Sequence, residues 1–167
     1  MMKIAFLFPG QGSQSVGMGR DLHRNSDTAR KLFDAASEAV GEDLTRITFT
    51  GPFEALSRTR VLQPAITAVN LSCAAYLTEA GLIPDACAGH SLGEIAALAG
   101  AELITPIEAV RLSAVRGRVM DDAAQQKAGS MVAVVGLEPD AVSSVMDEEF
   151  DSDEATVANI NAPNQIV

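Results

Sequence analysis

Apolar runs separated by short polar turns alternate between strand-like and helix-like spacing along this chain. The first run, 3–8, is almost continuously apolar and ends at Pro9-Gly10, which predicts a strand buried on both faces of a parallel sheet. Small and apolar residues at 86–88 predict a second short buried strand, and the run 94–101 predicts a buried helix directly after it. Short apolar strands followed by helices indicate an α/β protein.

Helix start and stop residues set the limits of the longer predicted helices. Ser26 is a typical N-cap and Gly41 a typical helix end, so we expect a helix over 27–40. Pro64 is typical of the first turn of a helix, and Gly81 is typical of a helix end, so we expect a helix from Pro64 to about Ala80. That helix is apolar nearly all round, and we therefore expect it to be buried.

The strongest local signal is Thr105-Pro106-Ile107-Glu108, which combines a capping box with proline at the first helical position and predicts a helix to about residue 125. On this helix we expect Leu112, Val115 and Val119 to face the core, with Arg116 at the edge of the buried stripe. Helix geometry alone favours a solvated arginine there. The other predicted elements are a helix over 52–58, a helix over 139–149, strands over 131–135, 156–160 and 165–167, and a turn over 161–164.

Composition and charge narrow the class of protein. With 47% hydrophobic residues among 167, the chain can bury the core of one domain, or of one domain and part of another. The net charge of −10 argues against nucleic acid as a partner. Cys73 and Cys87 lie in apolar runs without metal-binding spacing, which favours buried free thiols in a reducing compartment. We find no signal peptide and no apolar run of membrane-spanning length, and expect a soluble cytoplasmic protein that binds no membrane.

The stretch 86–94 carries the most specific chemical signal. Gly89-x-Ser91-x-Gly93 fits a nucleophile elbow, a sharp strand-to-helix turn on which a serine hydroxyl is exposed. Glycines flank the serine in such a turn because a Cβ at either position would clash. The N-terminus of the following helix would direct N–H groups towards an oxyanion formed at Ser91. The alternative is an ordinary glycine-bounded turn that contains a serine; the strand before it and the helix after it favour the elbow.

A second polar segment, Gly10-Gln11-Gly12-Ser13-Gln14, follows the first predicted strand. It is either a flexible turn or part of a site, since α/β proteins place their chemistry at the carboxyl ends of parallel strands. It has neither the Gly-Lys-Ser/Thr of a phosphate loop nor a dinucleotide-binding glycine pattern. Gln63, just ahead of the helix expected at Pro64, is either a helix-entry residue or part of a polar rim.

Five motifs, in order along the whole chain, resemble the successive blocks of malonyl-CoA:acyl-carrier-protein transacylases, the acyltransferases that load malonyl groups for fatty acid and polyketide synthesis. They are Phe8-Pro9-Gly10-Gln11-Gly12-Ser13-Gln14, Gln63-Pro64-Ala65, Gly89-His90-Ser91-Leu92-Gly93-Glu94, Arg116-Gly117 and Asn159-x-Asn161-x-Pro163. The resemblance implies a parallel-sheet α/β core resembling α/β hydrolases, with an inserted ferredoxin-like small subdomain. It places residues 1–127 in the amino-terminal part of the core and 128–167 at the start of the subdomain, so that both are incomplete in this chain.

The resemblance also implies roles for the matching residues. Ser91 would be the nucleophile that takes malonyl from malonyl-CoA as an ester and passes it to the phosphopantetheine thiol of acyl carrier protein. Gln11 and Leu92 would line the oxyanion hole with backbone N–H groups. Malonyl-CoA is the substrate, and no cofactor or metal is implied. The substrate-binding residues would be Arg116, for the free carboxylate of malonate, together with Gln63 and His90.

One part of the family pattern is missing. The catalytic histidine of the family follows the small subdomain, in a segment that this sequence lacks, and neither His23 nor His90 matches the position of the base. We therefore expect the chain to be the amino-terminal part of a transacylase and to be inactive alone. Two alternatives stay open: a serine hydrolase or thioesterase, which Arg116 disfavours because ordinary esters need no cation, and a non-catalytic fragment that binds the carrier protein.

Overall fold

The computed structural model describes residues 3–126, 129–151 and 154–167. The chain divides into two compact units, Met1–Gln126 and Lys127–Val167. The expected domain boundary, between residues 127 and 128, lies outside the described residues. The elements of the first unit are β1 (Ala5–Phe8), α1 (Arg20–Asn25), α2 (Asp27–Val40), α3 (Leu44–Thr50), α4 (Phe53–Ser57), α5 (Thr59–Glu79), β2 (Ala86–Gly89), α6 (Gly93–Gly100) and α7 (Pro106–Gln126). Those of the second are β3 (Val134–Val135), α8 (Pro139–Glu149), β4 (Ile160–Ala162) and β5 (Gln165–Ile166).

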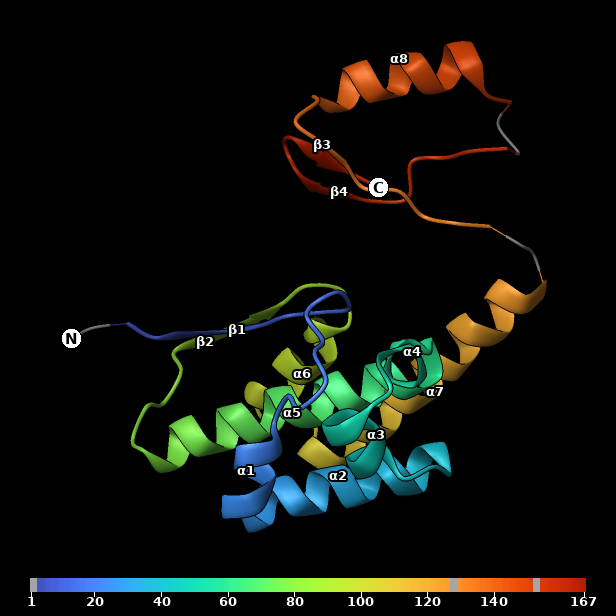
Figure 1. The fold of residues 1–167 in the computed structure, drawn as a ribbon. Helices are drawn as coiled ribbons and strands as arrows, with labels where there is room; N and C mark the ends of the chain where they lie inside the picture. The colour runs from blue at the N-terminus through green and yellow to red at the C-terminus, as the bar shows by residue number, and fades with distance from the viewer. Residues whose placement is uncertain (1–2, 127–128, 152–153) are drawn as a thin grey trace. The chain divides into compact units, whose positions relative to one another are not determined.

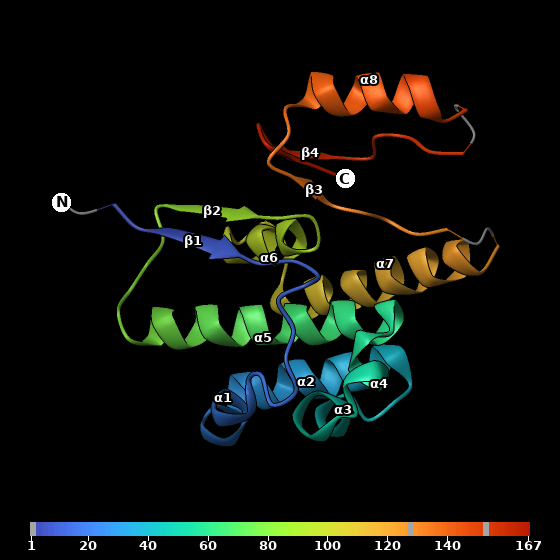
Figure 2. The same cartoon turned by 45° about the horizontal axis from the view of Figure 1, so that its top comes forward.

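The first unit is layered around α5 (Figure 1). β1 and β2 pair in parallel, from Ala5 opposite Ala86 to Phe8 opposite Gly89, which confirms the parallel arrangement. α6 and α5 cover one face of this pair, and α2 packs on the far side of α5 with α7 alongside (Figure 2). The carboxyl ends of both strands therefore meet at one edge, next to the start of α6.

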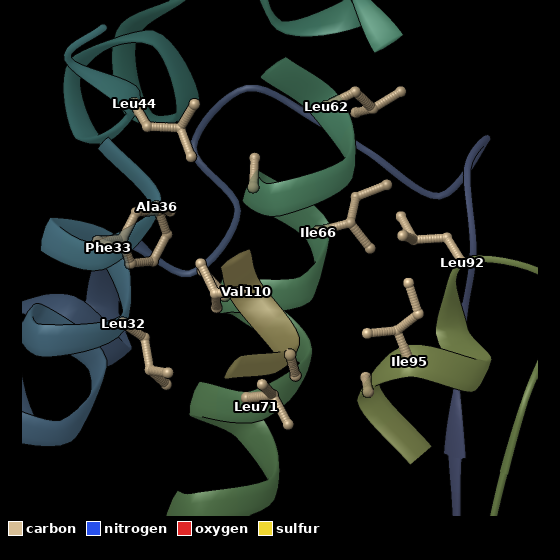
Figure 3. Close-up of a cluster of buried hydrophobic side chains, with 14 of the residues drawn as sticks. Leu32, Phe33, Ala36, Leu44, Leu62, Ile66, Leu71, Leu92, Ile95 and Val110 are labelled. Atoms are coloured by element: carbon tan, nitrogen blue, oxygen red, sulfur yellow. The ribbon is translucent and has the colours of Figure 1, made fainter. Parts of the chain in front are cut away.

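Apolar side chains of α5 fill the space between α2 and α6. By length and composition this helix could cross a membrane, contrary to the expectation from the sequence, but 61% of its most apolar window is buried within the fold. Such burial is typical of the core helix of a globular domain. Figure 3 shows this core, to which Leu32, Phe33, Ala36, Leu44, Leu62, Ile66, Leu71, Leu92, Ile95 and Val110 contribute.

Within the described residues of the first unit, helices cover one face of the strand pair. Phe8 is buried, whereas Leu7 is 76% exposed, and Ala86 and Ala88 of β2 are exposed as well. The predictions that the first strand is buried on both faces and that the second strand is buried are therefore wrong for the described residues. A continuous apolar run is typical of strands with cover on both faces, and here the helices supply cover on one.

The capping residues in the sequence correctly predicted where two helices, α2 and α7, begin. Ser26 Oγ accepts a hydrogen bond from the N–H of Ala29 at 3.2 Å at the start of α2. At the start of α7, the carboxylate of Glu108 accepts from both the N–H and the hydroxyl of Thr105, each at 2.7 Å. The predicted start of α5 is wrong, because the helix begins at Thr59 and Pro64 lies inside it. Proline near the beginning of a helix removes few helical hydrogen bonds, so the earlier turn can form.

Two predictions of burial are also wrong. Leu112, Val115 and Val119 are 46%, 46% and 59% exposed, and Cys73 is exposed as well. Cys87 is half-buried, and both thiols are free. Small residues let α7 approach α5 closely, so the small stripe faces the core in place of the larger side chains. The buried residues of α7 are Ala109, Val110, Ser113, Ala114 and Gly117.

The second unit pairs β5 with both β3 and β4 in an antiparallel sheet, against which α8 packs. α8 spans the predicted residues and buries Val142. The strand predicted over 156–160 lies instead at Ile160–Ala162, because the hairpin turn takes only Pro163 and Asn164. β3 is likewise shorter than the predicted strand over 131–135.

Candidate active site

Ser91 stands on a strained turn between β2 and α6. Its φ is +53°, a left-handed conformation that residues other than glycine seldom adopt. A Cβ on Gly89 would lie 2.0 Å from the carbonyl carbon of Gly93, and a Cβ on Gly93 would lie 2.0 Å from the carbonyl oxygen of Phe8. Only glycine fits at either position, and the serine between them is exposed. The turn therefore has the form of a nucleophile elbow.

The loop after β1 lies directly against this turn. The Phe8 carbonyl accepts from the N–H of His90 at 3.1 Å, and a Cβ on Gly10 would lie 2.4 Å from the His90 carbonyl oxygen. Gln11 follows in this loop, and Leu92 immediately precedes α6, where backbone N–H groups have no acceptor within the helix. Among the described residues, neither the Gln11 N–H nor the Leu92 N–H donates to another group of the chain.

Arg116 connects Ser91 to α5. Its Nη2 donates to Ser91 Oγ at 3.1 Å, and its Nη1 donates to Oε1 of Gln63 at 2.8 Å. The Gln63 side chain is fully buried inside α5, not at a helix entry, and its Nε2 lies 3.1 Å from Sδ of Met120. Two nitrogens of one planar guanidinium are thus fixed by oxygens from two other elements, which holds a cation next to an exposed hydroxyl.

The close approach of α5 and α7 brings Arg116 to this place. A Cβ on Gly117 would lie 2.8 Å from the carbonyl oxygen of Thr59 and 3.3 Å from Cβ of Gln63. The neighbouring arginines of α7 do not share this position, since Arg111 lies 3.7 Å from Glu38 and Arg118 is exposed. The stripe of Leu112, Val115 and Val119, at whose edge Arg116 was predicted to lie, is exposed; Arg116 instead borders the buried stripe of small residues that includes Gly117.

Neither histidine hydrogen-bonds Ser91. The side chain of His90 is exposed, and His23 packs edge-on between Phe33 and Phe49, with ring centroids 5.5 and 5.2 Å away. In the described part of the chain, the one hydrogen-bond partner of the Ser91 hydroxyl is Arg116. No group of three or more potential metal-binding side chains occurs among the described residues.

Comparison with known proteins decides the family. The family model of the acyl transferase domain matches residues 5–167. The chain belongs to this family. The malonyl CoA-acyl carrier protein transacylase of Bacillus subtilis (strain 168) is 39% identical over the full chain, which covers 53% of that relative. The resemblance predicted from the five motifs is therefore confirmed.

Solved structures support the same family. The malonyl-CoA:acyl carrier protein transacylase from Xanthomonas oryzae pv. oryzae matches with a TM-score of 0.83 and 39% identity over 99% of this chain and 54% of that chain. A malonyl-transacylase in complex with its type II PKS acyl-carrier protein matches with a TM-score of 0.82 and 32% identity, over 99% and 54% of the two chains. The α/β fold is thus confirmed, and the chain spans about half the length of the relatives it matches.

Sequence reasoning missed two residues that support the candidate site. Met120 contacts Gln63, and Asn70 donates to the carbonyl of Pro9 at 3.0 Å. Both have a sequence signal: Asn70 is a polar residue in an otherwise apolar run, and Met120 follows Arg116 by about one helical turn.

Proposed function

We propose that this chain carries the acyl-accepting serine of a malonyl-CoA:acyl-carrier-protein transacylase. Ser91 Oγ attacks the thioester carbonyl of malonyl-CoA and loses its proton to a base, and coenzyme A leaves as the thiol, so that a malonyl ester forms on Ser91. The phosphopantetheine thiol of acyl carrier protein then attacks the ester, and Ser91 regains its proton. The hydrogen bond from Arg116 to Ser91 Oγ, at 3.1 Å, is the observation that carries this proposal.

Arg116 would select an acyl group that bears a carboxylate. A guanidinium donates two parallel hydrogen bonds to a carboxylate, which ordinary acyl groups lack. Gln63 accepts from Nη1 at 2.8 Å and so fixes the plane of the guanidinium before substrate binds. His90, exposed next to Ser91, would border the same acyl group.

The free N–H groups of Gln11 and Leu92 would stabilise the negative charge on the attacked carbonyl oxygen. A preformed pair of donors needs no reorganisation when the charge develops, and each such donor is typically worth about 10²–10³ in rate. The absence of another acceptor for these two groups in the described residues supports this role.

The general base would come from outside the described residues. Neither His23 nor His90 hydrogen-bonds Ser91, and the chain covers 53% of its Bacillus subtilis relative. We propose that the first unit is the amino-terminal part of a core resembling α/β hydrolases, and that 128–167 begin a ferredoxin-like subdomain. The partners would be malonyl-CoA and acyl carrier protein, in the cytoplasm.

The test is the mass of the acylated protein. Malonyl-CoA is added with imidazole, which supplies an external general base. We expect one malonyl group on the peptide that contains Ser91, and none in Ser91→Ala. Addition of holo-acyl carrier protein should then discharge the ester and load the carrier.

The other outcomes separate the alternatives. Loss of the ester to water, equally fast with and without the carrier, would indicate a hydrolase. Carrier binding without any ester would indicate a non-catalytic module. A label on Cys87 would overturn the assignment of the nucleophile, and burial raises the pKa of that thiol, which makes it a poor rival at neutral pH.

A further inference from the structure

Asn70 is a buried polar side chain that the proposed reaction does not use. It lies in α5 between Val69 and Leu71 and is 7% exposed. Its Nδ2 donates to the carbonyl oxygen of Pro9 at 3.0 Å, across 61 positions of the sequence. Asparagine is seldom buried in a helix core unless its amide finds a partner, and here that partner belongs to the loop beside Ser91.

The Pro9 carbonyl is held by α5 and not by the strand pair. The Phe8 carbonyl still accepts from His90 N, at 3.1 Å, whereas the Pro9 carbonyl is bound by α5. Beyond it the loop is closed mainly by its own bonds: Ser13 Oγ donates to the Gly10 carbonyl at 2.8 Å, and the Gly12 N–H donates to Gln14 Oε1 at 2.8 Å. Internal bonds fix the shape of a loop but not its position on the fold.

We propose that Asn70 is a positioning residue that holds the Pro9–Ser13 loop in place, so that the Gln11 N–H faces the acyl oxygen on Ser91. The inference rests on the proposed function for its catalytic consequence. Gln11 lies two residues after Pro9, so an anchor at the Pro9 carbonyl limits how far its N–H can move. Gly10 can then stay against the His90 carbonyl, where a Cβ would lie at 2.4 Å.

The first measurement is amide hydrogen exchange of residues 10–14 in the 167-residue chain, read at Gly12 and Ser13, whose N–H groups have acceptors within the loop. Asn70→Ala removes the donor, and we expect exchange in this loop to accelerate at least about tenfold. The matched control is Ser72→Ala on the same helix, which also removes a buried bond to a backbone carbonyl, from Ser72 Oγ to Ala68 O at 2.6 Å, but this bond lies within α5. It should leave exchange in 10–14 unchanged.

Asn70→Asp keeps the shape of the side chain and replaces the alanine variant if that variant does not fold. An ionised carboxylate cannot donate to the Pro9 carbonyl, whereas a protonated one can. Burial should raise the pKa of the introduced carboxyl, so its loop should exchange faster than the parent at pH 8 and approach the parent at pH 5. A purely structural role elsewhere in α5 would not make the exchange of this loop depend on that proton.

The second measurement is the rate of Ser91 acylation by malonyl-CoA with imidazole. We expect at least about tenfold slower acylation in Asn70→Ala, with an unchanged dissociation constant for malonyl-CoA because Arg116 is untouched. Unchanged loop exchange in both Asn70 variants would overturn the inference, as would a loosened loop with parental acylation. A parent chain that never acylates, combined with a loosened loop in the variants, would count against the proposed function and leave the anchor standing.

Discussion

The guanidinium of Arg116 is held by Gln63, at 2.8 Å, across 53 positions of the chain. This bond joins α7 to the interior of α5, while Nη2 of the same guanidinium donates to the hydroxyl of Ser91. A buried amide thus sets the orientation of a cation before any ligand arrives. The arrangement is typical of a carboxylate-binding site, in which geometry as well as charge must be fixed in advance.

Arg116→Ala should slow acylation by malonyl-CoA by about 10–100-fold, while acylation by acetyl-CoA holds or rises, because only malonyl presents a carboxylate. Arg116→Lys should recover little, since an ammonium does not match a carboxylate with two parallel bonds. Both rates are measured by the mass of the acylated protein. Arg111→Ala, on an exposed arginine of the same helix, is the control. Equal loss for both acyl groups would mean that Arg116 supports the fold and does not select the substrate.

Gly93→Ala should destabilise the first unit by about 3 kcal/mol or more, because the added Cβ meets backbone that cannot give way. That Cβ would lie 2.0 Å from the Phe8 carbonyl oxygen. Urea unfolding gives the free energy of unfolding. Gly129→Ala is the control, because nothing lies within 4 Å of the added methyl group, and its effect should stay below about 0.5 kcal/mol. Similar unfolding curves for the two variants would contradict the tight elbow.

Gly117→Ala should push α7 away from α5, because its Cβ would lie 2.8 Å from the Thr59 carbonyl oxygen. We expect a loss of about 1–3 kcal/mol in stability and a lower ratio of malonyl to acetyl acylation, since Arg116 moves with the helix. Leu112→Ala, on the exposed side of α7, controls for changes in the helix itself. A variant that loses stability but keeps the parental ratio would show that Arg116 does not depend on this helix contact.

Ser91→Gly should unfold at a higher denaturant concentration than Ser91→Ala. Both variants lack the hydroxyl, but only alanine keeps a Cβ at a φ of +53°. The difference should be about 1 kcal/mol, the usual cost of a left-handed residue that is not glycine. Equal stability would indicate that the turn relaxes when its serine is replaced.

The capping box of α7 should make stability depend on pH. The hydroxyl of Thr105, and then its N–H, hold the pKa of Glu108 below its ordinary value of 4.5. The folded state therefore binds the proton less readily than the unfolded state, so the contribution is complete above the ordinary pKa and is lost as pH falls through the lowered one. Glu108→Gln should reduce the rise in unfolding free energy between about pH 3 and pH 6, measured by urea titration. An unchanged pH profile would count against the capping bonds.

The sequence predicted those parts of the fold that depend on local bonds. Ser26 and the Thr105–Glu108 pair form the caps that their positions predict, because a cap needs only neighbours along the chain. The face of α7 was predicted wrongly, since the larger Leu112 is exposed and the side of Gly117 is buried. The size and hydropathy of the residues of one helix do not show how closely it approaches another helix, because that distance depends on the side chains of both.

The candidate site likewise has one part that the local sequence predicts and another that depends on contacts between distant segments. Gly89, Ser91 and Gly93 reveal the elbow in one short stretch of sequence, whereas the contact from Asn70 to Pro9 joins segments 61 positions apart. The role of Arg116 required the family resemblance, because helix geometry alone favoured a solvated side chain. Pattern reasoning therefore located the proposed nucleophile, whereas the contacts around it are visible only in the structure.

The open face and edges of the strand pair have a consequence for handling the protein. Within the described residues β1 and β2 each have one neighbour, so the outer edge of each strand carries N–H and C=O groups that can pair with any extended peptide. Leu7, 76% exposed, adds an apolar side chain on the open face beside that edge. Such a strand is a template for aggregation, and at high concentration the 167-residue chain would be prone to precipitate through sheet-to-sheet association unless another polypeptide segment caps it.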